Sequence, residues 1–333
     1  MYISFDNGAH WQPFQLNLPQ VPVTDIKVFH NDLIVSTQGR AMWIMDNICA
    51  LHEITPQTSA SAVRLFKPRD GYRTRVSPTL LGPQIDYYLP AGVSGPVTLD
   101  ILDASGVVVN SYSSENASAA GGGRGGRGGR GGRGAAPGEA GAAGGAEEQQ
   151  FDPEAGGGGG GRGRGNAPPP RVTKETGMNR VVWDVRNEAG LTMPPGAYQA
   201  RLTINQKAAT QPFNVLIDPR IAAEGITAAD LKEQYEHNAR VRELGTQAQQ
   251  LLARVRTAMN GAAGENATKL RAISDQLVDT PEGVRYNKPG LQTHIRYLGS
   301  MTANVDQKIG RDAIDRYQEL KKQLDALDAQ VPK

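Results

Sequence analysis

Residues 1–55 alternate between short apolar runs and polar turns. Turns such as Asp6-Asn7-Gly8 and His30-Asn31-Asp32 bound runs of five to seven residues. Such spacing favours antiparallel sheets built from consecutive strands, the architecture of a β-propeller blade. The runs are Met1–Phe5, Trp11–Leu16, Val23–Phe29, Leu33–Thr37 and Ala41–Met45. The pattern therefore predicts one to two propeller blades in residues 1–55.

A second β-rich stretch spans residues 81–218, after a segment, 56–80, that is rich in Pro and is expected to be a connector. A glycine turn at 103–106 predicts a hairpin in this stretch. The expected strands are Ile85–Leu89, Val97–Leu102, Val107–Tyr112, Met178–Arg186, Gly196–Ile204 and Gln211–Ile217. Together they predict a small β-sandwich, interrupted by residues 115–171.

The interruption, residues 115–171, has the composition of a linker. Residues 121–134 consist of ten Gly and four Arg. A segment of this kind buries too little apolar surface to offset the entropy cost of ordering it, so we predict disorder.

Residues 226–330 change to a helical period. Thr227 with Asp230 resembles a capping box at the start of the first helix. Apolar residues then recur at helical spacing in four segments, which are separated by glycines and by the loop Thr280–Gly290. Amphipathic helices joined by short loops predict an antiparallel helical bundle. The expected fold is thus multidomain, β first and α afterwards.

Charge and composition argue against two classes of partner. The formal net charge is +2, which gives no general case for binding nucleic acid or an anionic membrane. The Gly/Arg run resembles RNA-binding RGG segments, but it holds no aromatic residue and the insert is nearly neutral. Six of its arginines (124, 127, 130, 133, 162 and 164) are nearly balanced by five acidic residues between 139 and 154. A linker is favoured, with RNA binding as an alternative.

The sequence shows neither a transmembrane segment nor a secretory signal. No apolar run approaches the roughly 20 residues of a transmembrane helix. Met1–Phe5 has neither the basic nor the long apolar region of a secretory signal. Its pattern is that of a β-strand whose first residues are missing. We therefore expect this chain to be a fragment of a longer protein.

Four residues near the N-terminus form a recognisable motif. Ser4, Asp6, Gly8 and Trp11 fit S-x-D-x-G-x-x-W. The Asp6 carboxylate can accept N–H groups of its own turn, and Gly8 can adopt the left-handed conformation that the turn needs. Trp11 returns on the next strand and can anchor the hairpin between neighbouring sheets. The other interpretation is an ordinary D-N-G hairpin with a nearby tryptophan.

This motif resembles the Asp box of bacterial BNR-repeat, sortilin-like β-propeller proteins, a family often labelled glycosyl hydrolases. Residues 37–46 (TQGRAMWIMD) resemble the end of that family's last blade, and 65–69 and 82–90 resemble its exit strand and next domain. Residues 177–186 and 194–198 resemble an immunoglobulin-like module that is also seen in flagellar-hook capping proteins. The helical tail is similar to the family's C-terminal region, whereas the Gly/Arg insert has no counterpart.

The resemblance implies a structural role for Ser4, Asp6, Gly8 and Trp11. Sialidase-type chemistry gathers arginines, a tyrosine nucleophile and carboxyl groups from several blades, so we expect the chain alone to be non-catalytic. In the intact parent, a hydrolase and a receptor for a peptide or carbohydrate remain alternatives. The implied partners are upstream blades, and the implied location is periplasmic or extracellular.

Arg40 is the candidate ligand-binding residue. It lies in a turn that opens, in propellers of this family, on the face opposite the Asp box. An ion pair with an acid of a neighbouring blade is the favoured alternative.

No other motif indicates a cofactor. The five histidines (10, 30, 52, 237 and 294) lack metal-ligand spacing, and Cys49 has no partner motif, so no metal or cofactor is expected. Asp86, Asp100, Asp103 and Asp184 fall in or beside strands, with no pairing that the sequence reveals.

Overall fold

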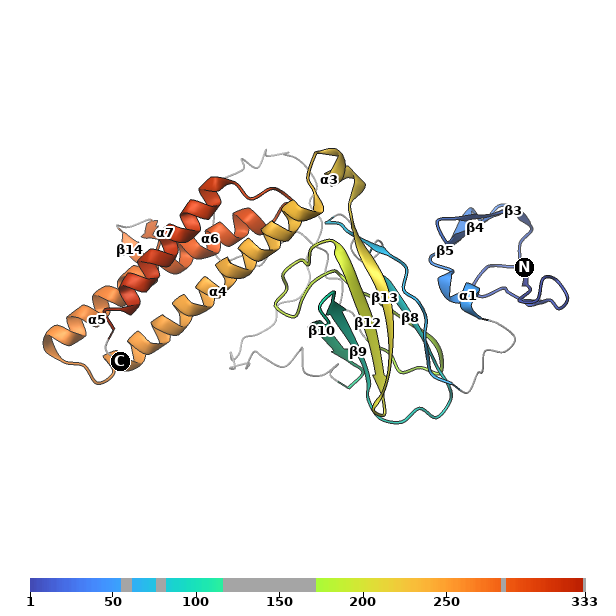
Figure 1. Cartoon of the computed structure of the whole chain (residues 1–333), viewed down its shortest axis with the longest axis horizontal. Helices are drawn as coiled ribbons and strands as arrows, with labels where there is room; N and C mark the ends of the chain where they lie inside the picture. The colour runs from blue at the N-terminus through green and yellow to red at the C-terminus, as the bar shows by residue number, and fades with distance from the viewer. Residues whose placement is uncertain (55–61, 76–81, 116–171, 283–285, 332–333) are drawn as a thin grey trace, which may run out of the picture. The chain divides into compact units, whose positions relative to one another are not determined.

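A computed structural model describes residues 1–54, 62–75, 82–115, 172–282 and 286–331. The chain divides into two compact units, Met1–Ser114 with Pro170–Lys333, and Glu115–Pro169. Almost all of the second unit, and with it the disorder predicted for residues 115–171, lies outside the described residues. The first unit is mixed β and α, with five sheets and six helices among its described residues (Figure 1).

The N-terminal segment forms two separate sheets and one short helix. Strands β1 (Tyr2–Ile3) and β2 (Gln12–Pro13) pair around the Ser4–Trp11 turn. The second sheet, here called the N-terminal sheet, has the order β3-β4-β5, and α1 (Cys49–Glu53) follows it. Its strands are β3 (Val23–Phe29), β4 (Asp32–Thr37) and β5 (Met42–Met45).

The β3–β4 hairpin has a two-residue loop with both residues in the left-handed region. His30 has φ 49° and Asn31 has φ 61°, the requirement of a type I′ turn. The three strands follow the sequence prediction, whereas β1 and β2 are two residues each and shorter than expected.

Two further sheets share one hydrophobic core and are here called the two-sheet region. The larger has the order β10-β9-β12-β13-β7 and the smaller β11-β8-β6. Alternate residues of β9 and β12, such as Leu99 and Leu202, point into the core, together with Trp183, Tyr198 and Phe213. The strands are β6 (Arg64–Leu65), β7 (Gly71–Arg73), β8 (Gln84–Leu89), β9 (Val97–Asp103), β10 (Val108–Ser113), β11 (Gly177–Val182), β12 (Gly196–Ile204) and β13 (Lys207–Ile217).

The structure corrects one expectation in this region. Residues 56–80 were expected to be a connector, yet β6 pairs with β8, and β7 pairs in parallel with β13. Pro68 lies between these strands, in neither ladder, so it does not prevent pairing on either side.

The helical region contains four amphipathic helices around a second core. Thr227 and Asp230 form the predicted capping box, because each side chain bonds the backbone N–H of the other. The core contains Leu244, Leu251, Ile295 and Leu320 among others. The elements are α3 (Pro219–Ala223), α4 (Ala228–Met259), α5 (Gly264–Leu277), β14 (Thr280–Glu282), β15 (Tyr286–Lys288), α6 (Leu291–Ala303) and α7 (Arg311–Asp328).

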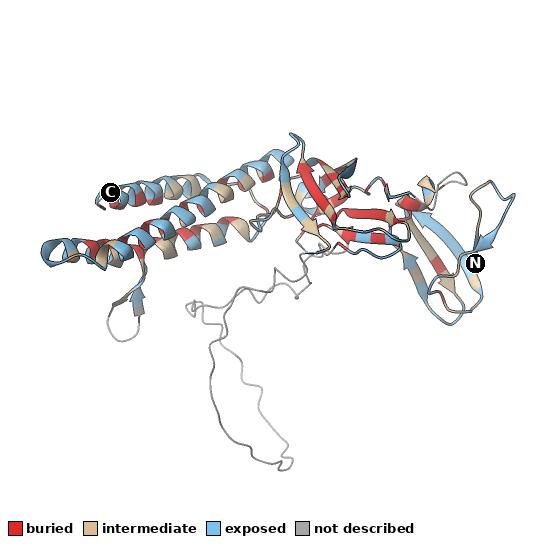
Figure 2. Ribbon diagram, turned by 90° about the horizontal axis from the view of Figure 1, so that it is seen from below, coloured by how far each residue is buried: buried red, intermediate tan, exposed pale blue. Residues whose placement is uncertain are grey.

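Burial is distributed unevenly between the parts. Buried residues form continuous stretches in the two-sheet region and a stripe along the helices, whereas the N-terminal strands are largely exposed (Figure 2). No helix among the described residues is long and apolar enough to cross a membrane.

Candidate functional site

The turn at residues 4–11 has the hydrogen bonding that its motif predicts. The Asp6 carboxylate accepts the backbone N–H of His10 at 2.8 Å and contacts the His10 ring at 2.6 Å. The Ser4 hydroxyl donates to Asp6 and accepts the N–H of Gly8, each at 2.8 Å. The hydrogen bonds from His10 and Ser4 lower the pKa of Asp6 to about 2. Gly8 has φ 89°, so a side chain there would be strained.

Trp11 does not reach a core in this chain. Its side chain is 63% exposed, although its ring lies against Gly8. The sequence motif expects this tryptophan to pack between sheets, and no described residue encloses it in that way. The geometry of the turn therefore agrees with the motif, while the packing partner that the motif implies is not among the described residues.

The N-terminal sheet carries apolar residues on both faces. Side chains alternate between the two faces of a strand, so the register assigns each residue to one face. Face A carries Ile26, Val28, Leu33, Val35, Trp43 and Met45. Face B carries Lys27, Phe29, Asp32, Ile34, Ser36, Met42 and Ile44.

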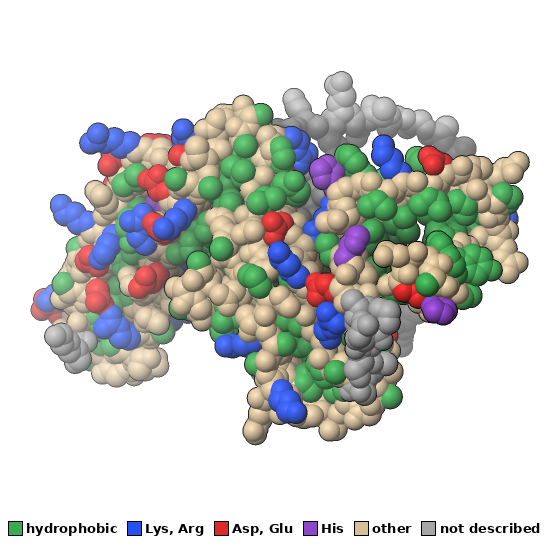
Figure 3. Space-filling model, turned by 45° about the vertical axis from the view of Figure 1, so that its right-hand side comes forward, with side chains coloured by type: hydrophobic (Ala, Val, Ile, Leu, Met, Phe, Trp, Pro, Cys, Tyr) green, Lys and Arg blue, Asp and Glu red, His purple; other side chains and the backbone are tan. Residues whose placement is uncertain are grey.

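Both faces expose apolar side chains, although Val35 in the middle of face A is buried. Ile26 and Val28 are exposed on face A, and Phe29, Met42 and Ile44 are exposed on face B. Of the sixteen large hydrophobic side chains that are exposed among the described residues, eight lie within residues 1–45. Hydrophobic side chains gather on this part of the surface (Figure 3). Contiguous apolar surface of this kind is typical of an interaction site.

Arg40, the predicted ligand-binding residue, lies exposed in the turn between β4 and β5. Its carbonyl accepts the indole N–H of Trp43 at 3.0 Å, which fixes the turn. Within the described ranges, no carboxylate pairs with its guanidinium. Among the described residues, no hydrogen bond or ion pair joins Arg40 to the Ser4–Trp11 turn.

An ion pair between a partly exposed arginine and a buried carboxylate connects the N-terminal segment to the two-sheet region. Arg180 on β11 and Asp86 on β8 form two hydrogen bonds, of 2.6 and 3.0 Å. Arg180 also donates to the backbone carbonyls of Asp46 and Asn47, at 3.0 and 3.2 Å. The Asn47 amide lies 3.4 Å from Asp86. These four residues, here called the clamp, join the end of β5 to the smaller sheet.

A second contact supports the clamp. Asp32, at the start of β4, accepts the backbone N–H of Asn47 at 2.9 Å and a guanidinium N–H of Arg69 at 2.6 Å. Asn47 itself is buried and has φ 58°, a conformation that asparagine tolerates better than most residues. Burial in this neighbourhood raises the pKa of the Cys49 thiol, so Cys49 is not an activated nucleophile.

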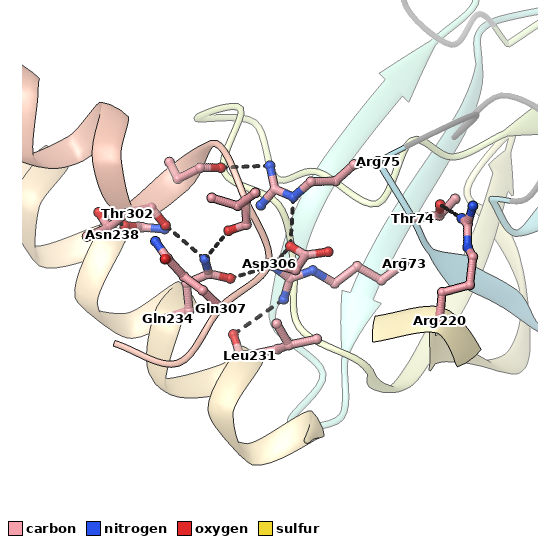
Figure 4. A network of polar contacts seen from close by, with 12 residues as sticks. Arg73, Thr74, Arg75, Arg220, Leu231, Gln234, Asn238, Thr302, Asp306 and Gln307 are labelled. Carbon is pink, nitrogen blue, oxygen red and sulfur yellow. Dashed lines mark hydrogen bonds and ion pairs between the residues drawn. The ribbon is translucent and has the colours of Figure 1, made fainter. Parts of the chain in front are cut away.

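A second buried network joins the two-sheet region to the helices (Figure 4). Arg73 on β7 donates to Asp306 and to the Gln234 side chain, each at 2.9 Å. Arg75 donates to the same Asp306 oxygen at 2.7 Å. The Gln234 amide donates in turn to the carbonyls of Thr302 and Val305. The side chains of Arg73 and Asp306 are each only 2% exposed.

Burial governs the electrostatics of this network. Burial is the largest influence on the Arg73 pKa and lowers it, while the charge of Asp306 acts in the opposite direction. The Nε atom of Arg73 has no hydrogen-bond partner in the described part of the chain. Because both charged side chains are buried, removing either one would leave the other as an uncompensated buried charge.

The two networks consist of arginines paired with carboxylates and backbone carbonyls. In the described ranges, no group of three or more His, Cys, Asp or Glu side chains could hold a metal ion. His237 is buried against Tyr317, and its Nε2 atom has no recorded hydrogen-bond partner.

Comparison with known proteins yields one structural similarity. No protein-family model matches the chain, and no curated protein matches its sequence. A solved structure of PorZ, an essential bacterial surface component of the type-IX secretion system of Porphyromonas gingivalis, is similar with 13% identity and a TM-score of 0.20. The similarity covers 59% of this chain and 23% of that chain. The match therefore spans about a quarter of PorZ, and at this score it supports no inference about function.

The clamp and the buried network were not found by sequence reasoning. Asp86 and Asp100 were noted without partners, yet each lies directly opposite an arginine on the neighbouring strand, Arg180 and Arg201 respectively. In each case an aspartate and an arginine lie in the middle of largely apolar strands. Had the pairing of these strands been known, the pattern would have predicted both ion pairs. Arg73 and Asp306 are 233 positions apart and give no local signal.

Proposed function

We propose that the N-terminal segment is part of a β-propeller, one to two blades that stack against further blades, and that the rest of the chain is its non-catalytic support. The observation that carries this proposal is the pair of apolar faces on the N-terminal sheet. A sheet with apolar residues on only one face needs one covering layer, whereas faces A and B both require one. Blades of a propeller are covered on both faces by their neighbours.

The Ser4–Trp11 turn supports the same proposal. Its hydrogen bonds fit an Asp box with a structural role, and the exposed Trp11 fits a residue whose packing partner is an adjacent blade. The preceding blades of a longer protein are the partner that we propose.

The support has two finer parts in this proposal. The five-stranded and three-stranded sheets share one core, which supports an immunoglobulin-like β-sandwich. The four helices share another core, which supports an antiparallel bundle. The clamp and the Arg73–Asp306 network would transmit force or orientation from the blades through the sandwich to the bundle, as in a periplasmic or extracellular scaffold.

A ligand-binding role at Arg40 is a second candidate. Its support is that Arg40 is exposed in the β4–β5 turn, and no described carboxylate occupies its guanidinium. An anionic group of a peptide or carbohydrate would fit such an arginine.

Dye binding and sedimentation test the main proposal. A double variant, Val28→Thr on face A with Met42→Thr on face B, should bind less of a hydrophobic dye and self-associate less than the unmodified chain. Its melting temperature should change little, because exposed positions contribute little to stability. Leu216→Thr, which removes an isolated exposed side chain of β13, is the control and should leave dye binding unchanged. A decrease of many degrees in the melting temperature of the double variant would show that the two faces are already packed and would overturn the proposal.

A further inference from the structure

The outer edge of β5 is open, and its direction can be derived from the register. Thr37 N–H donates to the Ala41 carbonyl, and these two residues continue the pairing of β4 with β5. In an antiparallel pair, hydrogen-bonded positions alternate. Trp43 and Met45 therefore direct their backbone groups toward β4, and Met42 and Ile44 direct theirs away from it.

These outward groups have no recorded partner. Strand β5 is the last in its sheet, and no hydrogen bond to the backbone of Met42 or Ile44 is recorded from any described residue. Their side chains are 71% and 60% exposed. The open edge thus offers two N–H groups and two carbonyls, beside apolar side chains on both faces.

Natural sheets protect exposed edges, and two other edge strands of the described chain, β3 and β10, show such protection. Strand β3 carries Asp25 and Lys27 and has an irregular register near Val23. Strand β10 has a register shift between Val108 and Asn110, where the Val109 carbonyl accepts the N–H of Glu188. Charges, bulges and covering loops are the usual protective devices. Strand β5, with the sequence Met-Trp-Ile-Met, carries no charged side chain, its pairing with β4 is regular, and no described residue is hydrogen-bonded to its outer edge before Asp46.

The open edge ends at a defined point. By the same alternation the Asp46 carbonyl points outward, and it accepts a guanidinium N–H of Arg180. The clamp therefore closes the edge at Asp46, so an added strand is limited to the length of β5. Its register is also set there, because the first available groups are those of Ile44.

We propose that the outer edge of β5 accepts an extended polypeptide strand, which pairs with Met42 and Ile44 and completes the N-terminal sheet as its fourth strand. The neighbours of this strand are Trp43 and Met45 on face A and Met42 and Ile44 on face B. It therefore carries a continuous apolar run of β-branched residues without proline, because both of its faces meet apolar side chains. This inference rests on the proposed function and names the form of polypeptide that the N-terminal segment binds.

A peptide with the sequence of residues 31–38, which contains the run Leu33-Ile34-Val35, is the probe. Added to the isotope-labelled full chain, it should shift the amide resonances of Met42 and Ile44 saturably and slow their hydrogen exchange. The amides of Trp43 and Met45 are already bonded to β4 and should change less. Absence of any change at Met42 and Ile44 at millimolar peptide, or changes confined to Ile26 and Val28 on β3, would overturn the proposal.

Two controls separate edge pairing from apolar contact. Ile44→Pro removes an outward N–H and should weaken peptide binding at least tenfold, whereas Ile44→Thr keeps the N–H and should bind within a few-fold of the unmodified chain. On the peptide, N-methylation of the residues that face β5 should abolish binding, and N-methylation of the alternate residues should not; this comparison does not depend on the folding of any variant. Equal binding of the two methylated peptides would overturn the proposal. If the peptide does not bind the edge of β5 but the dye experiment gives the expected result, the edge proposal fails and the proposal that faces A and B stack against further blades stands. The two proposals can therefore fail separately.

Discussion

Asp86 and Arg180 lie directly opposite each other on β8 and β11, and Arg180 extends past Asp86 to the carbonyls at the end of β5. One cross-strand ion pair therefore links β8 to β11 within the smaller sheet and also attaches the N-terminal segment to that sheet. The carboxylate of Asp86 is almost fully buried, so Arg180 replaces much of the solvation that the carboxylate loses on folding.

Removing Asp86 should destabilise the chain and loosen the N-terminal segment. Asp86→Asn should cost about 2 kcal/mol, less than the full cost of breaking a buried pair because Arg180 is partly exposed. The measurement is chemical denaturation. Arg186→Gln is the control, since Arg186 and Asp184 are 4.0 Å apart and both partly exposed, and it should cost less than 1 kcal/mol. Equal effects of the two substitutions would show that the clamp contributes no more than a surface pair.

The Arg73–Asp306 network should couple the unfolding of the β and helical regions. Asp306→Asn leaves the buried Arg73 charge without a counter-ion, and we expect a loss of about 3 kcal/mol. Calorimetry should then show separate transitions for the two regions in place of one. Asp315→Asn, in an exposed pair with Arg311, should leave the thermogram unchanged. A single unshifted transition in the Asp306 variant would contradict the coupling.

Stability should fall in mild acid because of His237. Burial, with a smaller effect of Arg240, lowers the pKa of His237 below its usual value of 6.5. The unfolded chain therefore binds a proton below about pH 6.5 that the folded chain does not, so the free energy of unfolding decreases as the pH falls from 6.5 toward the folded pKa. Tyr317 from α7 faces the same ring.

Substitution of His237 checks that assignment. His237→Phe keeps a ring against Tyr317 and removes the titration, so the decrease in unfolding free energy between pH 7 and pH 5 should become smaller. His294→Phe is the control. His294 lies beside Tyr297 at the edge of a surface hollow, and this variant should keep the full decrease in unfolding free energy between pH 7 and pH 5. An unchanged pH dependence in the His237 variant would assign the effect to other groups.

The Ser4–Trp11 turn should depend on the left-handed conformation of Gly8. Gly8→Ala places a β-carbon at φ 89° and should destabilise the turn by about 1 kcal/mol. Faster exchange of the His10 amide, which bonds to Asp6, is the readout. Gly261→Ala is the matched control, because a β-carbon there meets nothing within 4 Å and its φ is not in the left-handed region. Unchanged His10 exchange in the Gly8 variant would show that the turn tolerates a side chain.

The sequence predicts the elements better than their pairing. Strand β12 begins and ends where its alternation and its glycine indicate, at Gly196 and Ile204. The start of β13 was missed, because Asn205 and Gln206 form a left-handed turn without the glycine that usually marks one. Strands β6 and β7 were missed because they are two and three residues long and lie next to Pro68.

The site shows the same division. Hydrogen bonds within the Ser4–Trp11 turn are local, so residue spacing predicts them. The clamp joins residues 94 positions apart, and its existence depends on which strands become neighbours, a property that no local pattern contains. The exposure of Trp11 likewise depends on which sheets surround it, so the motif alone could not predict it.

Hydrogen exchange of the full chain tests the central claim, that the N-terminal sheet carries two faces whose packing partners lie elsewhere. Amides of β3, β4 and β5 should exchange at least a hundredfold faster than those of β9 and β12, which lie in a closed core. The measurement is made at a concentration where the chain is monomeric. Slow exchange of the Trp43 and Met45 amides, equal to that of Leu99 and Leu202, would show that the N-terminal sheet is already packed and that its faces need no further partner.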